Sequence, residues 1–213
     1  MIETNRKISN AVISSASSDL SDIHLTSKNI GIYERQIEAL SNELRLIKDR
    51  QIELRASGSV AEIMAQLKNT SGILSHCTLL KEDISALLKL FSAITGAEDF
   101  RLLFCTITSN MCRRFHTDIN DLRLLCTYIG PGTLWLPNEA VNQAVLQSSD
   151  NEAELVLPGW EAQQVKTGDV VILKGALFED SNPILHRSPP IEESHDKRLL
   201  LRIDTNTFIN SLS

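Results

Sequence analysis

The chain has 213 residues, with 21 Lys and Arg against 27 Asp and Glu, and a formal net charge of -6 at pH 7. This acidic balance argues against a general nucleic-acid-binding protein, because such proteins carry a positive footprint. No apolar run approaches the ~20 residues that span a bilayer. We therefore expect a cytoplasmic protein with no membrane contact.

The four cysteines are spread along the chain and form no CxxC pair; they are Cys77, Cys105, Cys112 and Cys126. Paired metal-ligand spacing is the usual mark of a zinc ribbon, so a zinc site made of cysteines alone is excluded. We expect reduced thiols, as in other cytoplasmic proteins.

Residues 1–30 are rich in Ser and lack an apolar period, so we expect a mobile N-terminus there. Residues 31–96 predict a helical buttress, because apolar side chains recur at three- and four-residue spacing. The first helix is expected at about 34–54 and the third at about 79–94, with Gly96 ending it. A shorter helix between them carries Val60, Ile63, Met64 and Leu67.

Residues 97–213 have the sequence pattern of a β-domain, in which β-prone segments are separated by turns such as Gly130-Pro-Gly132. The segments expected as strands are 100–108, 111–118, 122–129, 133–136, 152–157, 169–173 and 198–204. Helices come first and strands follow, which indicates an α+β protein rather than alternating βαβ units. The predicted arrangement packs the N-terminal helices on a C-terminal double-stranded β-helix, the jelly roll or cupin-like fold.

The motif His116-Thr-Asp118 is the sharpest local feature of this half. On a strand, side chains two residues apart share a face, so the imidazole and the carboxylate can bind one metal ion. The alternative is a surface His beside an Asp that starts a turn, since Asn120-Asp121 follows.

A second histidine and a basic strand follow in the sequence. His186 precedes Ser-Pro-Pro, which places it at a strand end or in an exposed loop rather than inside a helix. Arg198 and Arg202 share one face of a strand. If that face is buried, each needs an anionic partner such as a ligand carboxylate; on an outer face they would pair with nearby acids.

Two histidines and one carboxylate on one side of a metal form the facial triad of non-haem Fe(II) oxygenases. The C-terminal half accordingly resembles the iron and 2-oxoglutarate-dependent dioxygenase superfamily, in its prolyl-hydroxylase-like branch. The resemblance runs through His116-Thr-Asp118, residues 123–129, 130–133, 166–173 and His186. It implies Fe(II) and 2-oxoglutarate as cofactors and His116, Asp118 and His186 as metal ligands.

The same resemblance implies that a basic residue after the second His holds the oxo-acid. Arg198 is the best candidate by spacing, and Lys197 and Arg202 are the alternatives. Further residues are weighed as pocket or supporting residues against simple packing or surface pairing: Tyr128, whose hydroxyl would reach a carboxylate, and Trp135, Arg123, Arg187 and Ser188. The Gly-Pro-Gly-Thr turn and Trp135 depart from the hydroxylase pattern.

The sequence also resembles an uncharacterised bacterial family, domain of unknown function 1826, over about residues 25–207. The matching stretches are residues 32–35, 113–118, 123–136, 168–169, 186–190 and 198–204. This resemblance implies a link to zinc homeostasis through CobW-type metallochaperone GTPases, but no activity.

Three functions follow as expectations. The first is an oxygenase that hydroxylates a small molecule or a protein side chain. The second is a non-redox module that binds zinc, or another metal, in bacterial metal homeostasis. The third is a degenerate jelly roll used for interaction.

Overall fold

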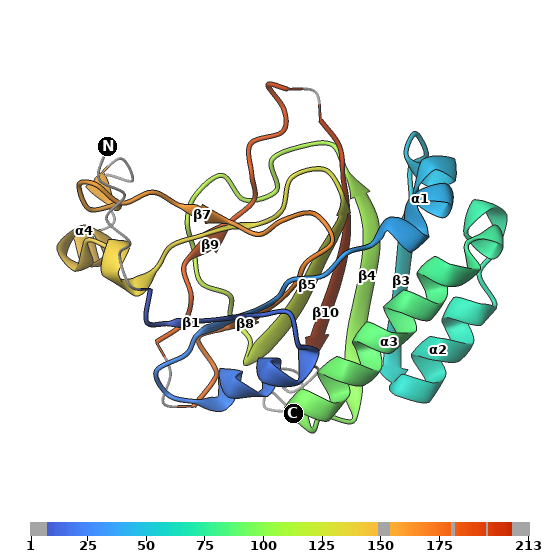
Figure 1. Cartoon of the computed structure of the whole chain (residues 1–213), viewed down its shortest axis with the longest axis horizontal. Helices are drawn as coiled ribbons and strands as arrows, with labels where there is room; N and C mark the ends of the chain where they lie inside the picture. Colours follow the sequence, from blue (N-terminus) through green and yellow to red (C-terminus); the bar gives the residue numbers. More distant parts are fainter. Residues whose placement is uncertain (1–7, 149–153, 180–181, 195, 206–213) are drawn as a thin grey trace.

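A computed structural model describes residues 8–148, 154–179, 182–194 and 196–205 (Figure 1). The larger of its two sheets has seven strands in the order β1-β2-β8-β5-β10-β4-β3. All neighbouring strands are antiparallel except β1 and β2, which are parallel. The strands are β1 (Ala11–Ser14), β2 (Ile30–Tyr33), β3 (Glu53–Ser59), β4 (Asp99–Ile107), β5 (Leu122–Ile129), β8 (Val170–Lys174) and β10 (Arg198–Thr205).

A smaller sheet covers part of the larger one. It has the order β7-β6-β9, formed by β6 (Leu134–Trp135), β7 (Gln163–Gln164) and β9 (His186–Arg187). Leu125 and Leu200 of the larger sheet, Trp135 of the smaller one and Ile184, which precedes β9, belong to one buried hydrophobic cluster. We call the face of the larger sheet that carries Leu125 and Leu200 its inner face.

Helices α1, α2 and α3 cover the opposite face of the larger sheet, where Figure 1 shows α2 and α3 beside β3 and β4, whereas α4 lies apart from them. The α-helices are α1 (Ser41–Ile47), α2 (Val60–Lys68), α3 (Thr78–Thr95) and α4 (Gln143–Ser148). Short 3-10 helices are η1 (Ser17–His24), η2 (Glu38–Leu40), η3 (Gly72–His76) and η4 (Asn138–Ala140). No helix in the described part of the chain combines the length and apolarity needed to cross a membrane.

Several predicted elements are confirmed. A capping box between Ser59 and Glu62 begins α2, and Gly96 in the left-handed conformation ends α3. The strands β4, β5, β8 and β10 lie within a residue or two of the segments expected from the sequence.

The helix expected at 34–54 is wrong. Only η2 and α1 form there, and the chain then enters β3, whose main chain pairs with β4 along the edge of the sheet. Leu54 and Ala56 of β3 pack into the helical side of the core. Pairing with a distant strand overrides the local helical pattern, which sequence periodicity alone cannot show.

The N-terminal part also differs from the mobile N-terminus predicted for residues 1–30, of which the structure describes residues 8–30. That part forms β1 and η1, and Leu20 and Ile23 of η1 are buried. Because β1, β2 and β3 all join the larger sheet, the arrangement of N-terminal helices on a C-terminal jelly roll is not confirmed. The fold is a mixed α and β structure with a large, mostly antiparallel sheet.

Two predicted strands reduce to single bridges. Within 111–118 only His116 is paired, with His186, and within the described part of 152–157 only Val156 is paired, with Val141. Residues 152 and 153 lie outside the described residues.

Candidate metal centre

Backbone pairing brings the two histidines of the candidate site together. His116 N donates to His186 O, and His186 N donates to His116 O, both at 3.0 Å. The two residues therefore lie directly opposite each other across an antiparallel bridge, where side chains share a face. Their ring centroids are 4.6 Å apart.

Asp118 completes the cluster, because it lies two residues beyond His116 on an extended chain. Its Oδ1 is 3.7 Å from His116 Nε2, and its Oδ2 is 3.3 Å from His186 Nε2. One possible ligand atom from each residue lies within 4.8 Å of the other two. The two distances to Asp118 are shorter than twice a metal–ligand bond of about 2.0–2.2 Å, so the carboxylate can share one metal ion with either imidazole.

The cluster is partly closed to solvent. His186 and Asp118 are buried, whereas the side chain of His116 is 35% exposed. Burial alone would raise the pKa of Asp118, but the contact with His186 and the charges of Arg123 and His116 hold it below its ordinary value. The carboxylate is therefore ionised at neutral pH, as a metal ligand must be. Two imidazoles and one carboxylate are the donor set of non-haem Fe(II) sites, and they suit zinc as well.

Arg123 supports Asp118 from β5. Its NH1 lies 2.5 Å from Asp118 Oδ2, and its Nε lies 2.5 Å from Asp204 Oδ1. Asp204 is the residue directly opposite Arg123 on β10. Of the two sequence alternatives for Arg123, a pocket residue or a strand ion pair, the structure shows the ion pair.

Arg198 is a buried cation with neutral partners only. It is 2% exposed, and its NH2 bonds to Thr127 Oγ1 at 3.1 Å and Thr133 Oγ1 at 3.4 Å. Among the described residues no carboxylate pairs with it, and its Nε has no hydrogen-bond partner. Burial lowers the pKa of Arg198 to about 10, so it stays charged at neutral pH. Such a charge fits an anion supplied by a ligand.

Strand alternation places Arg198 on the inner face of the larger sheet, which is the side that the smaller sheet with His186 covers. On β10, Arg198 shares the inner face with Leu200, and its partner Thr133 lies two residues before Trp135. Trp135 is buried and lies directly opposite His186 on β9. Two residues of a strand span roughly 7 Å. The contact of Arg198 with Thr133 is therefore about this far along the chain from Trp135, the residue opposite His186.

Tyr128 lies elsewhere, on the helical side of β5. Its ring meets Phe104, and its hydroxyl donates to Asp83 Oδ2 at 2.5 Å. Cys126, on the same face, contacts Gly168 O. The structure does not bring Tyr128 together with Arg198, and the cluster of possible ligands found among the described residues contains no cysteine.

The remaining candidates lie around the cluster. Arg202 pairs with Asp204 Oδ2 at 2.9 Å, and the Arg187 guanidinium lies over the Phe115 ring at 4.8 Å. Ser188 N donates to Cys112 O, and Lys197 is exposed. The structure therefore offers Arg198, rather than Lys197 or Arg202, as a buried cation without a carboxylate partner in the described part of the chain.

Sequence reasoning missed Thr127, Thr133 and Asp204. The only sequence signal for Asp204 is its position two residues after Arg202 on the same strand. Nothing in the sequence pairs it with Arg123.

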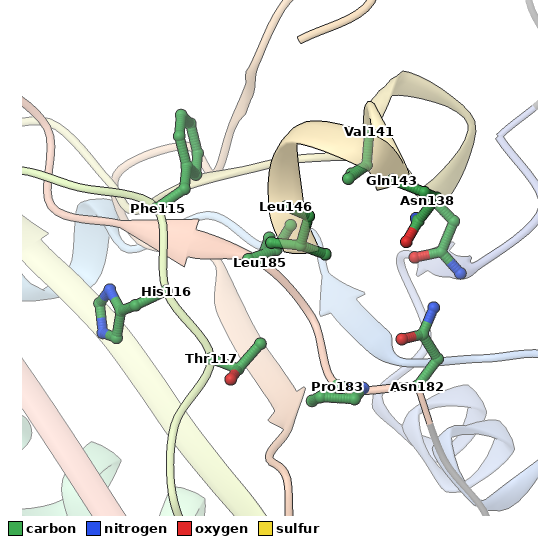
Figure 2. A pocket seen from close by; sticks show the side chains of 10 residues that line it. All are labelled: Phe115, His116, Thr117, Asn138, Val141, Gln143, Leu146, Asn182, Pro183 and Leu185. Atoms are coloured by element: carbon green, nitrogen blue, oxygen red, sulfur yellow. The ribbon is translucent and has the colours of Figure 1, made fainter. Parts of the chain in front are cut away.

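A cavity of about 470 Å³ borders the segment around His116 (Figure 2). Its lining mixes apolar side chains such as Leu146 and Leu185 with the amides of Asn138 and Asn182. Figure 2 shows the His116 ring on the other side of its chain from Thr117 and Leu185, and neither Asp118 nor His186 lines the cavity. His116 does line the cavity, so the cavity adjoins the ligand cluster at this one residue.

Comparisons with known proteins agree with this fold. The chain is similar to dioxygenase for auxin oxidation 1 from Arabidopsis thaliana, solved with 2-oxoglutarate, at a TM-score of 0.50 and 9% identity, covering 92% of this chain and 91% of that one. It is also similar to a prolyl-4-hydroxylase from Pseudomonas putida, at a TM-score of 0.47 and 12% identity, covering 89% and 98%. No curated protein matches the sequence.

The resemblance to dioxygenases seen in the sequence is thus confirmed for the fold. A family model, "Protein of unknown function (DUF1826)", matches residues 14–204, which is most of the chain. The protein belongs to this family, DUF1826.

Proposed function

We propose that this protein is a non-haem Fe(II) and 2-oxoglutarate-dependent oxygenase that hydroxylates a small molecule or a protein side chain. The observation that carries the proposal is the cluster of His116, Asp118 and His186, whose possible ligand atoms lie within 4.8 Å of one another. Two histidines and one carboxylate leave coordination positions open for a co-substrate and O₂. We also propose that the two sheets form the double-stranded β-helix core of the dioxygenase superfamily.

Arg198 supports 2-oxoglutarate as the co-substrate. A five-carbon dicarboxylate that binds the metal at its oxo-acid end carries a second carboxylate, which the buried guanidinium can hold by two parallel hydrogen bonds. The hydroxyls of Thr127 and Thr133 already accept from Arg198 and have protons left to donate to the same carboxylate. When bound, iron would supply the chemistry by which O₂ oxidises 2-oxoglutarate to succinate and CO₂ and places its other oxygen atom in a C–H bond of the substrate.

Other residues of the chain would exclude water from the site and set the side from which the substrate approaches. Trp135 and the apolar cluster around it keep water away from the interior between Arg198 and His186. Among the three candidate ligands His116 has the most exposed side chain, so the substrate is expected to approach from its side.

Anaerobic reconstitution of the purified protein with Fe(II) and 2-oxoglutarate tests the proposal. We expect a weak visible charge-transfer band, followed by succinate formation when air is admitted. His186→Ala should abolish both, while His76→Ala, at an exposed position on η3, should abolish neither. If the protein gives neither band nor succinate but holds zinc on the same three residues, the non-redox zinc-binding alternative replaces the oxygenase.

A further inference from the structure

Arg123 acts on one particular oxygen of Asp118. Its NH1 lies 2.5 Å from Asp118 Oδ2, the oxygen that also faces His186 Nε2 at 3.3 Å. The other oxygen, Oδ1, faces His116 Nε2 at 3.7 Å. The Arg123 and Asp118 side chains are only 18% and 10% exposed, so water screens this ion pair weakly. The contact is a close ion pair rather than a hydrogen bond, since Oδ2 has no hydrogen-bond partner among the described residues.

A second carboxylate fixes Arg123 in this position. Asp204, directly opposite on β10, accepts from Arg123 Nε at 2.5 Å and is itself buried. Asp204 Oδ1 also accepts from Asn120 Nδ2 at 3.3 Å, and its Oδ2 lies 2.9 Å from Arg202 Nε, which makes no hydrogen bond within the described part of the chain. The guanidinium spans both carboxylates, and turning it away from either would leave buried charge poorly compensated.

The backbone around Asp118 is constrained as well. Asp118 O accepts from Ala176 N at 2.8 Å, and the loop that carries Ala176 comes from the end of β8. A Cβ at Gly175 would lie 2.1 Å from Asn120 Oδ1, so this loop is closely packed on the segment after Asp118. With the main chain fixed here, the orientation of the Asp118 carboxylate depends on its contacts with His116, His186 and Arg123, of which Arg123 is the one that is not a candidate ligand.

We propose that Arg123, held by Asp204, is a positioning residue that makes Asp118 bind the metal through a single oxygen. This inference rests on the metal site of the proposed function. A carboxylate that chelates through both oxygens takes an additional coordination position. With Oδ2 held against the Arg123 charge in the ion pair, that position stays open for the co-substrate or O₂.

Co(II), added to the full-length protein without 2-oxoglutarate, is the probe. The intensity of its d–d bands falls as its coordination number rises. We expect weaker bands in Arg123→Gln, because Asp118 is then free to chelate, and a Co(II) affinity lower by about 10-fold to 100-fold, as is usual when an outer partner of a ligand is lost. Arg123→Lys should behave like Arg123→Gln, since one ammonium cannot span both carboxylates.

Arg202→Gln is the matched control, because Arg202 also binds Asp204 but does not contact Asp118. Its spectrum and affinity should match those of the unmodified protein. Asp204→Asn is a second test, free of any contact with the metal ligands, and should shift the spectrum in the same direction as Arg123→Gln. Circular dichroism shows which variants are folded; if Arg123→Gln is not, Asp204→Asn decides.

Unchanged d–d bands with a Co(II) affinity within two-fold in the folded Arg123→Gln or Asp204→Asn variant would overturn the positioning role, as would full rescue by Lys. These outcomes leave the proposed function standing. An unmodified protein that binds no Co(II) would instead remove the metal site, and the positioning role with it.

Discussion

Replacing Arg198 by Met is expected to stabilise the ligand-free protein and, in the same variant, to weaken 2-oxoglutarate binding. Arg198 is 2% exposed and has only hydroxyl partners among the described residues. Burial lowers its pKa from 12.5 to about 10, which corresponds to about 3 kcal/mol. A base with a lowered pKa destabilises the fold at every pH below that value, so this cost is fully present at pH 7.

Methionine fills a similar volume without the charge, so the substitution should recover most of that energy. For a chain of this size, about 3 kcal/mol corresponds to a rise in Tm of roughly 6–12 °C. Binding should move in the opposite direction, because removing one partner of a buried carboxylate–guanidinium pair costs about 3–5 kcal/mol. With about 1.4 kcal/mol per factor of ten, the affinity should fall by more than roughly 100-fold.

Thermal unfolding of the zinc-loaded protein, with and without 2-oxoglutarate, measures both effects without turnover. The unmodified protein should gain Tm on adding 2-oxoglutarate, whereas Arg198→Met should start higher and gain nothing. Arg202→Met is the control, because Arg202 is paired with Asp204 and its loss should not raise Tm. A lower Tm in Arg198→Met together with an unchanged response to 2-oxoglutarate would refute the reasoning.

Two further predictions concern stability. Asp83→Asn should lower the free energy of unfolding in urea by about 3–5 kcal/mol. The substitution leaves the Arg35 side chain, which is 11% exposed, without its carboxylate partner, and it weakens the hydrogen bond from Tyr128. An unchanged urea midpoint would contradict this. Gly130→Ala should lower Tm well below Gly72→Ala: both glycines have positive φ, but a Cβ at Gly130 would lie 2.1 Å from a main-chain oxygen, whereas at Gly72 nothing lies within 4 Å. Equal Tm values for these two variants would contradict this prediction, because they would show that the main chain near Gly130 moves aside at little cost in stability.

The cluster of ligands was predictable because it depends on little tertiary information. The expectation that His116 and Asp118 lie on one side of the chain needs only their two-residue spacing, and His186 follows from its place in the order of motifs. Arg198 was predictable as a cation near the site, but its burial was not, since that depends on which face of β10 the smaller sheet covers.

The sequence could not show which face of each strand is covered or in which register distant strands pair. Tyr128 and Thr127 are neighbours in the sequence, and only the packing of the helices on β5 decides that Thr127 rather than Tyr128 meets Arg198. The Arg123–Asp204 pair depends on the register of strands 81 residues apart. The predicted helix over 34–54 failed for the same reason, because β3 is stabilised by a distant strand.

The two histidines are brought together by main-chain atoms, since both bonds of the bridge run between the backbones of His116 and His186. The spacing of these ligand positions is therefore a property of the chain path rather than of imidazole chemistry. Replacing either residue by another metal ligand, or by a residue that binds none, leaves the bridge in place. In the metal site proposed above, a single substitution at either position would accordingly change the set of donor atoms without removing this backbone bridge.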